Sequence, residues 1–369
     1  MKQVKLLGIE FSRGLSAYAV ILVHSGDQTW GLPIDNTAIE FRLFFYFAVP
    51  FFLAVAFYFM TAKPEHIYSA KFWQSKVERI VVPYVVWSTI FFIFRAIIFT
   101  LTKKPERLQQ MWQDPLSMIF FGGASVQLYF LPFLFTGFLL LLLIPLLARW
   151  QIDTFGRLGL LTVVSIILYT ALESSGNGFQ LSETSIAFKS LTSNLNIDLM
   201  NNPLMRLILV EIAWIVRCLP YFSIALILNK LHLNEKLLNV KIAGSISLAI
   251  LFILLDTLGK ILLPVGLSEP AIAFSLLLFS IAISKYFRNS AVITMPIASV
   301  GLCSFGIYLI HPFVMYGLKH TIGNLLPEIS THVSIFSMSI ISLSSFIVSW
   351  AIVAYLNKNK LARKLLFGV

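Results

Sequence analysis

Arg13 and His24 lie near the two ends of an apolar stretch, SRGLSAYAVILVH, which covers residues 12–24. In an α-helix, a separation of eleven residues returns both side chains to within about 20° of one face, roughly 16 Å apart along the axis. A guanidinium binds carbonyl or phosphate oxygens, and an imidazole accepts a proton near neutral pH. The spacing therefore favours one elongated ligand, or two linked sites, along a single helix face.

Glu10 precedes Arg13 by three residues, a spacing that allows an ion pair on one helix. Placing an ionisable side chain in a membrane span costs at least about 2.5 kcal/mol on insertion scales. Such residues usually face the interior of a helix bundle and have a function. We therefore expect Glu10, Arg13 and His24 to form a polar strip that faces the bundle interior.

The composition is that of an integral membrane protein. Of the 369 residues, 58% are hydrophobic and only 12% are charged, and the mean hydropathy is +0.84. Soluble domains carry about 25% charged residues. The net charge of +11 does not indicate nucleic-acid binding, because Lys and Arg cluster beside apolar runs, as they do near anionic lipid.

Ten apolar runs are long enough to cross a membrane as helices. None shows the alternation of a membrane β-strand, so we predict an all-α polytopic transmembrane bundle of about ten helices. The predicted spans cover residues 6–25, 41–62, 80–101, 126–148, 157–173, 204–229, 242–264, 270–287, 295–318 and 333–356. With no second soluble domain visible, residues 1–369 are expected to form a single membrane-embedded domain.

The Lys and Arg residues between the runs predict the orientation of the chain, since they concentrate on the cytoplasmic side. If the N-terminus is cytoplasmic, most of these residues lie in inner segments. The outer segments then hold only Lys103, Lys104, Arg107, Lys189, Arg206 and Lys319. Both termini are therefore predicted to be cytoplasmic, which puts Arg13 toward the inner side and His24 toward the outer side.

Further ionisable residues lie inside the predicted spans. Asp256 and Lys260 are four residues apart and are expected to pair, most simply as a structural salt bridge. Glu211 and Arg217 lie about 120° apart on one helix, so each needs a partner on another helix. For that second pair, a structural role and a functional role are equally open.

His311 directly precedes Pro312 in the stretch SFGIYLIHPF, residues 304–313. A proline inside a helix frees a backbone carbonyl one turn earlier. The imidazole of His311 therefore either satisfies that carbonyl or contacts a substrate.

Several stretches resemble acyltransferase family three, a group of integral-membrane O-acyltransferases with ten core helices. IEFSRGLSAYAVILVHS, residues 9–25, resembles the first-helix signature, which is an arginine, ten residues and a histidine behind an acidic residue. The late stretch at 304–313 matches a Ser-Tyr-Gly-Ile-Tyr-Leu-Ile-His-Pro pattern closely. Three other stretches are similar in order and spacing: VPFFLAVAFYFM at 49–60, FWQSKVERIVVPY at 72–84, and VQLYFLPFLF at 126–135, where Gln127 and Tyr129 replace His and Trp.

The resemblance implies transfer of an acyl group, most often acetyl, from cytoplasmic acyl-CoA to a hydroxyl of an extracytoplasmic glycan or its lipid-linked precursor. His24 would be the general base or a covalent acyl carrier. The residues expected to act in catalysis are His24, Arg13 and Glu10; those expected to bind acyl-CoA are Lys76, Arg79 and Arg13; those expected to bind the saccharide are His311, Tyr308 and Tyr129. Acyl-CoA is expected as a co-substrate, with no permanently bound cofactor and no metal.

The other function class left open is a membrane transporter or flippase for a polysaccharide precursor, since intramembrane charges also suit solute coupling. Transporters often contain inverted repeats with broken helices in matching positions. The Pro and Gly positions of the two halves do not match in this way. A scaffold for a polysaccharide synthase is a third reading. The expected partners are acyl-CoA, the saccharide acceptor and membrane lipid but no nucleic acid, and the expected location is a bacterial inner membrane.

Overall fold

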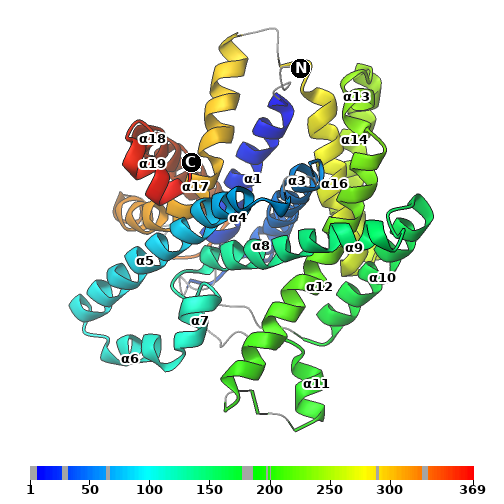
Figure 1. Ribbon diagram of the computed structural model, residues 1–369. Helices are drawn as coiled ribbons and strands as arrows, with labels where there is room; N and C mark the ends of the chain where they lie inside the picture. Colours follow the sequence, from blue (N-terminus) through cyan, green and yellow to red (C-terminus); the bar gives the residue numbers. More distant parts are fainter. Residues whose placement is uncertain are drawn as a thin grey trace. The chain divides into compact units, whose positions relative to one another are not determined.

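Helices make up every named secondary-structure element in the part of the chain that the structure describes (Figure 1). The computed structural model describes residues 6–26, 32–63, 67–176, 186–196, 198–199, 201–287, 291–325 and 331–369. Within these ranges, the one extended pairing is an isolated parallel bridge between Ile34 and Val333. The all-α fold class predicted from the sequence is confirmed.

Nine of the ten predicted spans coincide with helical segments that are long and apolar enough to cross a membrane. Among the described residues these segments are Asn36–Thr61, Ala70–Leu101, Val126–Arg149, Phe155–Ser174, Pro203–Lys230, Ile242–Leu262, Val265–Ile283, Val292–Ile322 and Ile335–Leu356. The remaining span is helix α1 (Leu7–Ser25), whose 19 residues include Glu10, Arg13 and His24. These ionisable side chains lower its mean hydropathy, so a helix that would otherwise read as a span carries polar groups for another reason. The chain is a multi-pass membrane protein.

The contacts within the chain define two compact units, which are described separately here. Unit 1 comprises Met1–Ala56, Leu231–Leu263 and Ser268–Lys360, and unit 2 comprises Phe57–Lys230, Pro264–Leu267 and Leu361–Val369. The prediction of a single domain over residues 1–369 stays a prediction.

Unit 1 is built around α1, which packs against α17 and α18. The elements of this unit are α1, α2 (Asn36–Leu43), most of α3 (Ala48–Thr61), α13 (Leu233–Leu238), α14 (Ile242–Leu254), η6 (Leu255–Gly259), α15 (Lys260–Leu262), most of α16 (Val265–Ile283), α17 (Ala291–Leu325) and α18 (Ile335–Leu356).

Small residues on α1 let its neighbours come close, as in many membrane helix pairs. The Gly8 backbone N–H donates to Ser284 Oγ at 3.0 Å, and Ser280 Oγ donates to Ser12 Oγ at 2.6 Å. A methyl group at Gly8 would lie 1.9 Å from the Ser280 carbonyl oxygen. Helix α16 therefore lies directly against the first half of α1.

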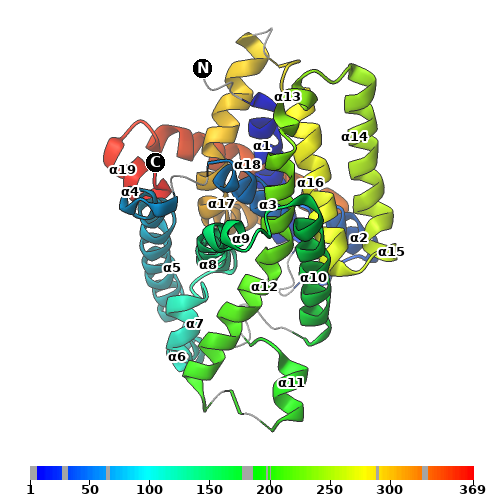
Figure 2. The same ribbon diagram turned by 45° about the vertical axis from the view of Figure 1, so that its right-hand side comes forward.

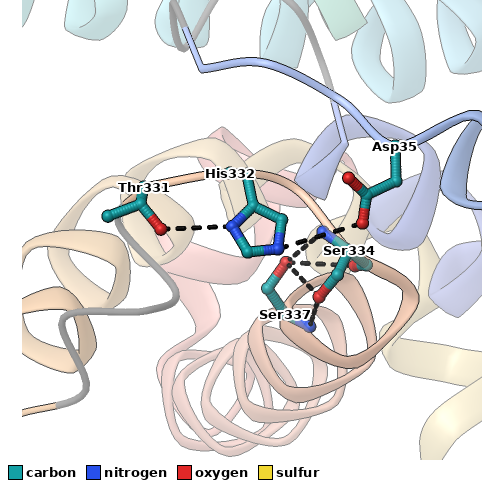
Figure 3. Close-up of polar contacts among 5 residues, drawn as sticks. All are labelled: Asp35, Thr331, His332, Ser334 and Ser337. Atoms are coloured by element: carbon teal, nitrogen blue, oxygen red, sulfur yellow. Dashed lines mark hydrogen bonds and ion pairs between the residues drawn. The ribbon is translucent and has the colours of Figure 1, made fainter.

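The segments that lead into α2 and α18 are joined side by side (Figure 3). The backbone N–H of Asp35 donates to the Val333 carbonyl at 3.0 Å, and that of Val333 donates to the Pro33 carbonyl at 2.8 Å. Ser334 and Ser337 form a capping box that starts α18. His332 lies in this segment about half exposed, with Nε2 3.9 Å from Asp35 Oδ2.

Unit 2 contains the remaining helices, among which α10 and α12 run side by side (Figure 2). Its elements are α4 (Ala70–Lys76), η3 (Val77–Val81), α5 (Val82–Leu101), α6 (Pro105–Gln113), α7 (Pro115–Phe120), η4 (Val126–Tyr129), α8 (Phe130–Phe138), η5 (Leu139–Leu143), α9 (Ile144–Arg149), α10 (Phe155–Ser174), α11 (Lys189–Asn194), α12 (Pro203–Lys230) and α19 (Lys360–Phe367). Near the start of α12, buried Arg206 pairs with Asp114 at 2.5 Å, and Asp114 also caps α7. The sequence did not reveal this buried pair, since Arg206 was expected in an outer segment.

Candidate active site

The imidazole of His24, on α1, stacks on the imidazole of His311, on α17. The ring centroids are 5.4 Å apart and the rings are inclined by 26°. His24 is half-buried, whereas His311 is fully buried. Two histidines that the sequence analysis treated separately therefore belong to one site in unit 1.

The sequence around His311 determines which ring nitrogen carries the proton. Pro312 has no N–H, so the carbonyl of Tyr308, four residues earlier, loses its helical partner. His311 Nδ1 lies 2.7 Å from that carbonyl oxygen and can satisfy it only as an N–H donor. Nε2 then carries a lone pair, and it has no hydrogen-bond partner within the described residues.

This arrangement combines the two roles that the sequence left open for His311. The backbone contact that the proline requires is present, and it fixes the orientation of the ring. The same contact leaves Nε2 as a buried acceptor, which costs free energy unless another group donates to it. A ligand hydroxyl is the kind of group that would satisfy Nε2.

Tyr308 is buried next to this pair, with its ring 6.2 Å from the ring of His311. Phe52, on α3, lies on its other side at 6.4 Å. The predicted substrate-binding residues His311 and Tyr308 are therefore neighbours, and aromatic surface surrounds the polar groups as in many sites for small molecules.

The predicted ion pair between Glu10 and Arg13 is present. Arg13 Nη1 donates to Glu10 Oε2 at 3.2 Å, and both side chains are partly buried. Gly301, on α17, comes so close that a methyl group there would lie 2.2 Å from Glu10 Oε2. The missing side chain at Gly301 therefore makes room for the carboxylate that holds Arg13.

The end of α1 that carries His24 is held by residues that the sequence analysis did not connect to it. Arg42 Nη1 donates to the Gly26 carbonyl at 2.6 Å, although Arg42 was expected to reach toward an interface. Ser25 Oγ lies within 2.7 Å of the Leu22 carbonyl and 3.3 Å of the Met338 carbonyl. These contacts from α2 and α18 fix the position of His24.

The other predicted site residues lie in unit 2. Arg79 is exposed on η3, a single turn of π-helix, and π-turns often occur at functional sites. Lys76 is buried instead, with Nζ 4.8 Å from the centre of the Phe72 ring. Tyr129 is half-buried at the end of η4 and stacks on Phe133 with ring centroids 6.5 Å apart.

The remaining intramembrane charges have the kinds of partner that the sequence predicted. Asp256 and Lys260 pair at 2.6 Å, and Lys260 Nζ also donates to the Leu43 carbonyl. Glu211 accepts from Thr136 Oγ1, on α8, at 2.6 Å. Arg217 lies over the rings of Phe133 on α8 and Tyr169 on α10. Glu211 and Arg217 thus interact with other helices.

The family model for the acyltransferase domain of acyltransferase family three matches residues 6–354, nearly the whole chain. The chain belongs to this family. The comparison with curated proteins and the comparison with solved structures gave no match.

Membership identifies the protein as a membrane acyltransferase. In this acyltransferase, α1 and α17 bring together the two motifs of the sequence that contain a histidine within a span. Within the described residues, no three His, Cys, Asp or Glu side chains come together as they would around a metal ion.

Proposed function

We propose that the protein transfers an acetyl group from cytoplasmic acetyl-CoA to a hydroxyl of an extracytoplasmic or lipid-linked saccharide in a bacterial inner membrane. The observation that carries this proposal is the stack of His24 on His311, which supplies a half-buried imidazole beside a buried, open acceptor nitrogen. Both groups suit a sugar hydroxyl that must lose its proton before it attacks a thioester.

The proposed chemistry uses His24 as a general base. Its imidazole takes the proton from the saccharide hydroxyl while the hydroxyl oxygen attacks the thioester carbonyl carbon. The carbon–sulfur bond then breaks, and the departing thiolate takes the proton from the imidazolium. The products are the O-acetyl ester and free CoA. Alternatively, His24 attacks the thioester first and passes the acetyl group to the hydroxyl, with the same products.

His311 and Tyr308 are proposed to orient the acceptor. The open Nε2 of His311 can accept a hydrogen bond from a second sugar hydroxyl, and the aromatic ring of Tyr308 can cover an apolar sugar face. Tyr129 in unit 2 is proposed as a further contact to the saccharide.

The cations are proposed to bind the donor. Arg13, held by Glu10, suits a carbonyl or phosphate oxygen of the donor. Arg79 is exposed and can contact a phosphate through two N–H groups at once. Lys76 is proposed as a second phosphate contact, for which its ammonium must turn away from the Phe72 ring.

The test is release of free thiol by the purified protein in lipid nanodiscs, given acetyl-CoA and a lipid-linked saccharide. An acetyltransferase releases one thiol for each ester formed, whereas a transporter, flippase or scaffold releases none above the rate without protein. Absence of thiol release with a range of lipid-linked acceptors and acyl-CoA donors would contradict the proposal.

A further inference from the structure

Helix α19 packs against the turn that carries Arg79 (Figures 1 and 2). A methyl group at Gly368, just after this helix, would lie 2.4 Å from Arg79 Cα and 2.7 Å from the Arg79 carbonyl oxygen. The two backbones are therefore in direct contact. Both segments belong to unit 2.

Gly368 ends α19 in a way that only glycine allows without strain. Its φ is +64°, in the left-handed region that side chains disfavour. The Gly368 N–H donates to the Lys364 carbonyl at 3.1 Å, and the Val369 N–H donates to the Arg363 carbonyl at 3.4 Å. These two bonds form a Schellman motif, which turns the chain sharply after the helix. The turn brings Gly368 onto the backbone of Arg79.

Two further contacts hold this helix in place. Trp87 Nε1, on α5, donates to the Leu366 carbonyl at 2.8 Å, and Phe367 is buried. Because α5 continues directly from η3, these contacts join α19 to both sides of the turn that presents Arg79. The position of Arg79 thus depends on α19.

The exposed face of α19 is positively charged. Arg363 and Lys364 are both exposed, in the same turn that contacts Arg79. Arg363 Nε donates to the Val369 carbonyl, which fixes the base of its guanidinium. The acidic residue beside Arg79 is Glu78, and its carboxylate accepts a hydrogen bond from Gln74.

We propose that α19 is part of the donor-binding site: its last turn positions Arg79, and Arg363 and Lys364 bind phosphate groups of the CoA thioester. This inference rests on the proposed function, since it takes acyl-CoA as the donor. The family model ends at residue 354, so α19 lies outside the region that the family match covers. The structure gives a reason for added cations, because Lys76 is buried against Phe72 and leaves Arg79 as the exposed cation of the predicted pair.

The first experiment compares two donors in nanodiscs of uncharged lipid: acetyl-CoA, and acetyl-pantetheine, which has the thioester but no phosphate. For the double variant Arg363→Gln, Lys364→Gln, we expect the KM for acetyl-CoA to rise about tenfold, the effect of losing one charge-assisted contact. The kcat and the KM for acetyl-pantetheine should not change.

An equal change with both donors, or no change with acetyl-CoA, would overturn the proposal. An equal change would assign α19 a general structural role or a role in holding the protein at the lipid surface. These outcomes are distinct from a failure of the proposed function, in which the unaltered protein releases no thiol from either donor.

The second experiment tests the contact between Gly368 and Arg79. Gly368→Ala adds a methyl group where it meets the Arg79 backbone, so the KM for acetyl-CoA should rise several-fold. Gly176→Ala is the matched control, because Gly176 has φ +74° but the nearest atom to a methyl group there is 3.7 Å away. Equal KM values for the two variants would contradict the positioning role. If Gly368→Ala fails to fold, the surface double variant still tests the proposal.

Discussion

The imidazoles of His24 and His311 form a stacked pair in which the two rings differ in exposure and in hydrogen bonding. His24 is half-buried on α1, while His311 is fully buried and its Nδ1 is bonded to the Tyr308 carbonyl. One ring can therefore meet a substrate and exchange a proton, and the other is held in a single orientation. This difference gives each histidine a separate prediction.

His24→Ala should lower thiol release by about 10²- to 10⁴-fold, the usual contribution of a general base. Expression and membrane insertion should be unaffected, because the imidazole is half-buried and its loss leaves α1 anchored by Arg42 and Ser25. The measurement is thiol release at matched amounts of purified protein. Near-normal transfer by this variant would remove His24 from the reaction.

His311→Asn separates the structural role of His311 from its role toward substrate. The Asn amide can donate to the Tyr308 carbonyl as Nδ1 does, but it offers nothing at the position of Nε2. We expect an unchanged apparent Tm and a loss of about 10- to 100-fold in kcat/KM, the value of one hydrogen bond to a reacting group at 1.5–3 kcal/mol. Unchanged kinetics would show that Nε2 has no role.

Pro312→Ala provides the companion test of why His311 is bonded to the backbone. His311→Ala leaves the Tyr308 carbonyl buried without a donor, which costs about 1–3 kcal/mol. Adding Pro312→Ala restores a backbone N–H that reaches this carbonyl, so the double variant should recover the lost apparent Tm but not the activity. If stability is not recovered, the link between the proline and the histidine is wrong.

The local features of the site could be predicted from the sequence because they depend on spacing along one helix. The ion pair of Glu10 with Arg13 and that of Asp256 with Lys260 follow from separations of three and four residues, and both are present. Helical spans follow from apolar runs that need internal backbone hydrogen bonds in lipid. Nine of those runs are helices of sufficient length.

The contacts between distant segments could not be predicted. Nothing in a single sequence pairs His24 with His311, or shows that Gly301 makes room for Glu10, because these contacts depend on how α1 and α17 pack. The burial of Lys76 was also missed, since a cation beside a predicted interface usually reaches water. Its ammonium packs on the Phe72 ring instead. The roles assigned to the site residues stay predictions.

Arg79→Ala should raise the KM for acetyl-CoA more than it lowers kcat, because binding the CoA phosphates stabilises the bound donor and the transition state alike. We expect a rise of about tenfold, since a charge-assisted contact is worth about 1.5–3 kcal/mol. Lys104→Ala is the control: it removes a positive charge from the predicted outer side and should leave the KM unchanged. An unchanged KM in Arg79→Ala would count against the phosphate contact.

Gly301→Ala should disturb the ion pair that holds Arg13. The added methyl group would lie 2.2 Å from Glu10 Oε2 and 2.8 Å from Glu10 Cα, so α1 and α17 must separate or the carboxylate must move. Overpacking of this kind costs about 1–3 kcal/mol. We expect a lower apparent Tm in detergent and a higher KM for acetyl-CoA, since Arg13 loses its fixed orientation.

Gly317→Ala on the same helix is the matched control for this substitution. A methyl group there meets nothing within 4 Å, and alanine stabilises a helix interior by about 0.5–1 kcal/mol relative to glycine. Its apparent Tm should therefore stay the same or rise, with unchanged kinetics. If Gly301→Ala behaves like Gly317→Ala in both measurements, the close packing of α17 on Glu10 does not position Arg13, and the ion pair forms from α1 alone.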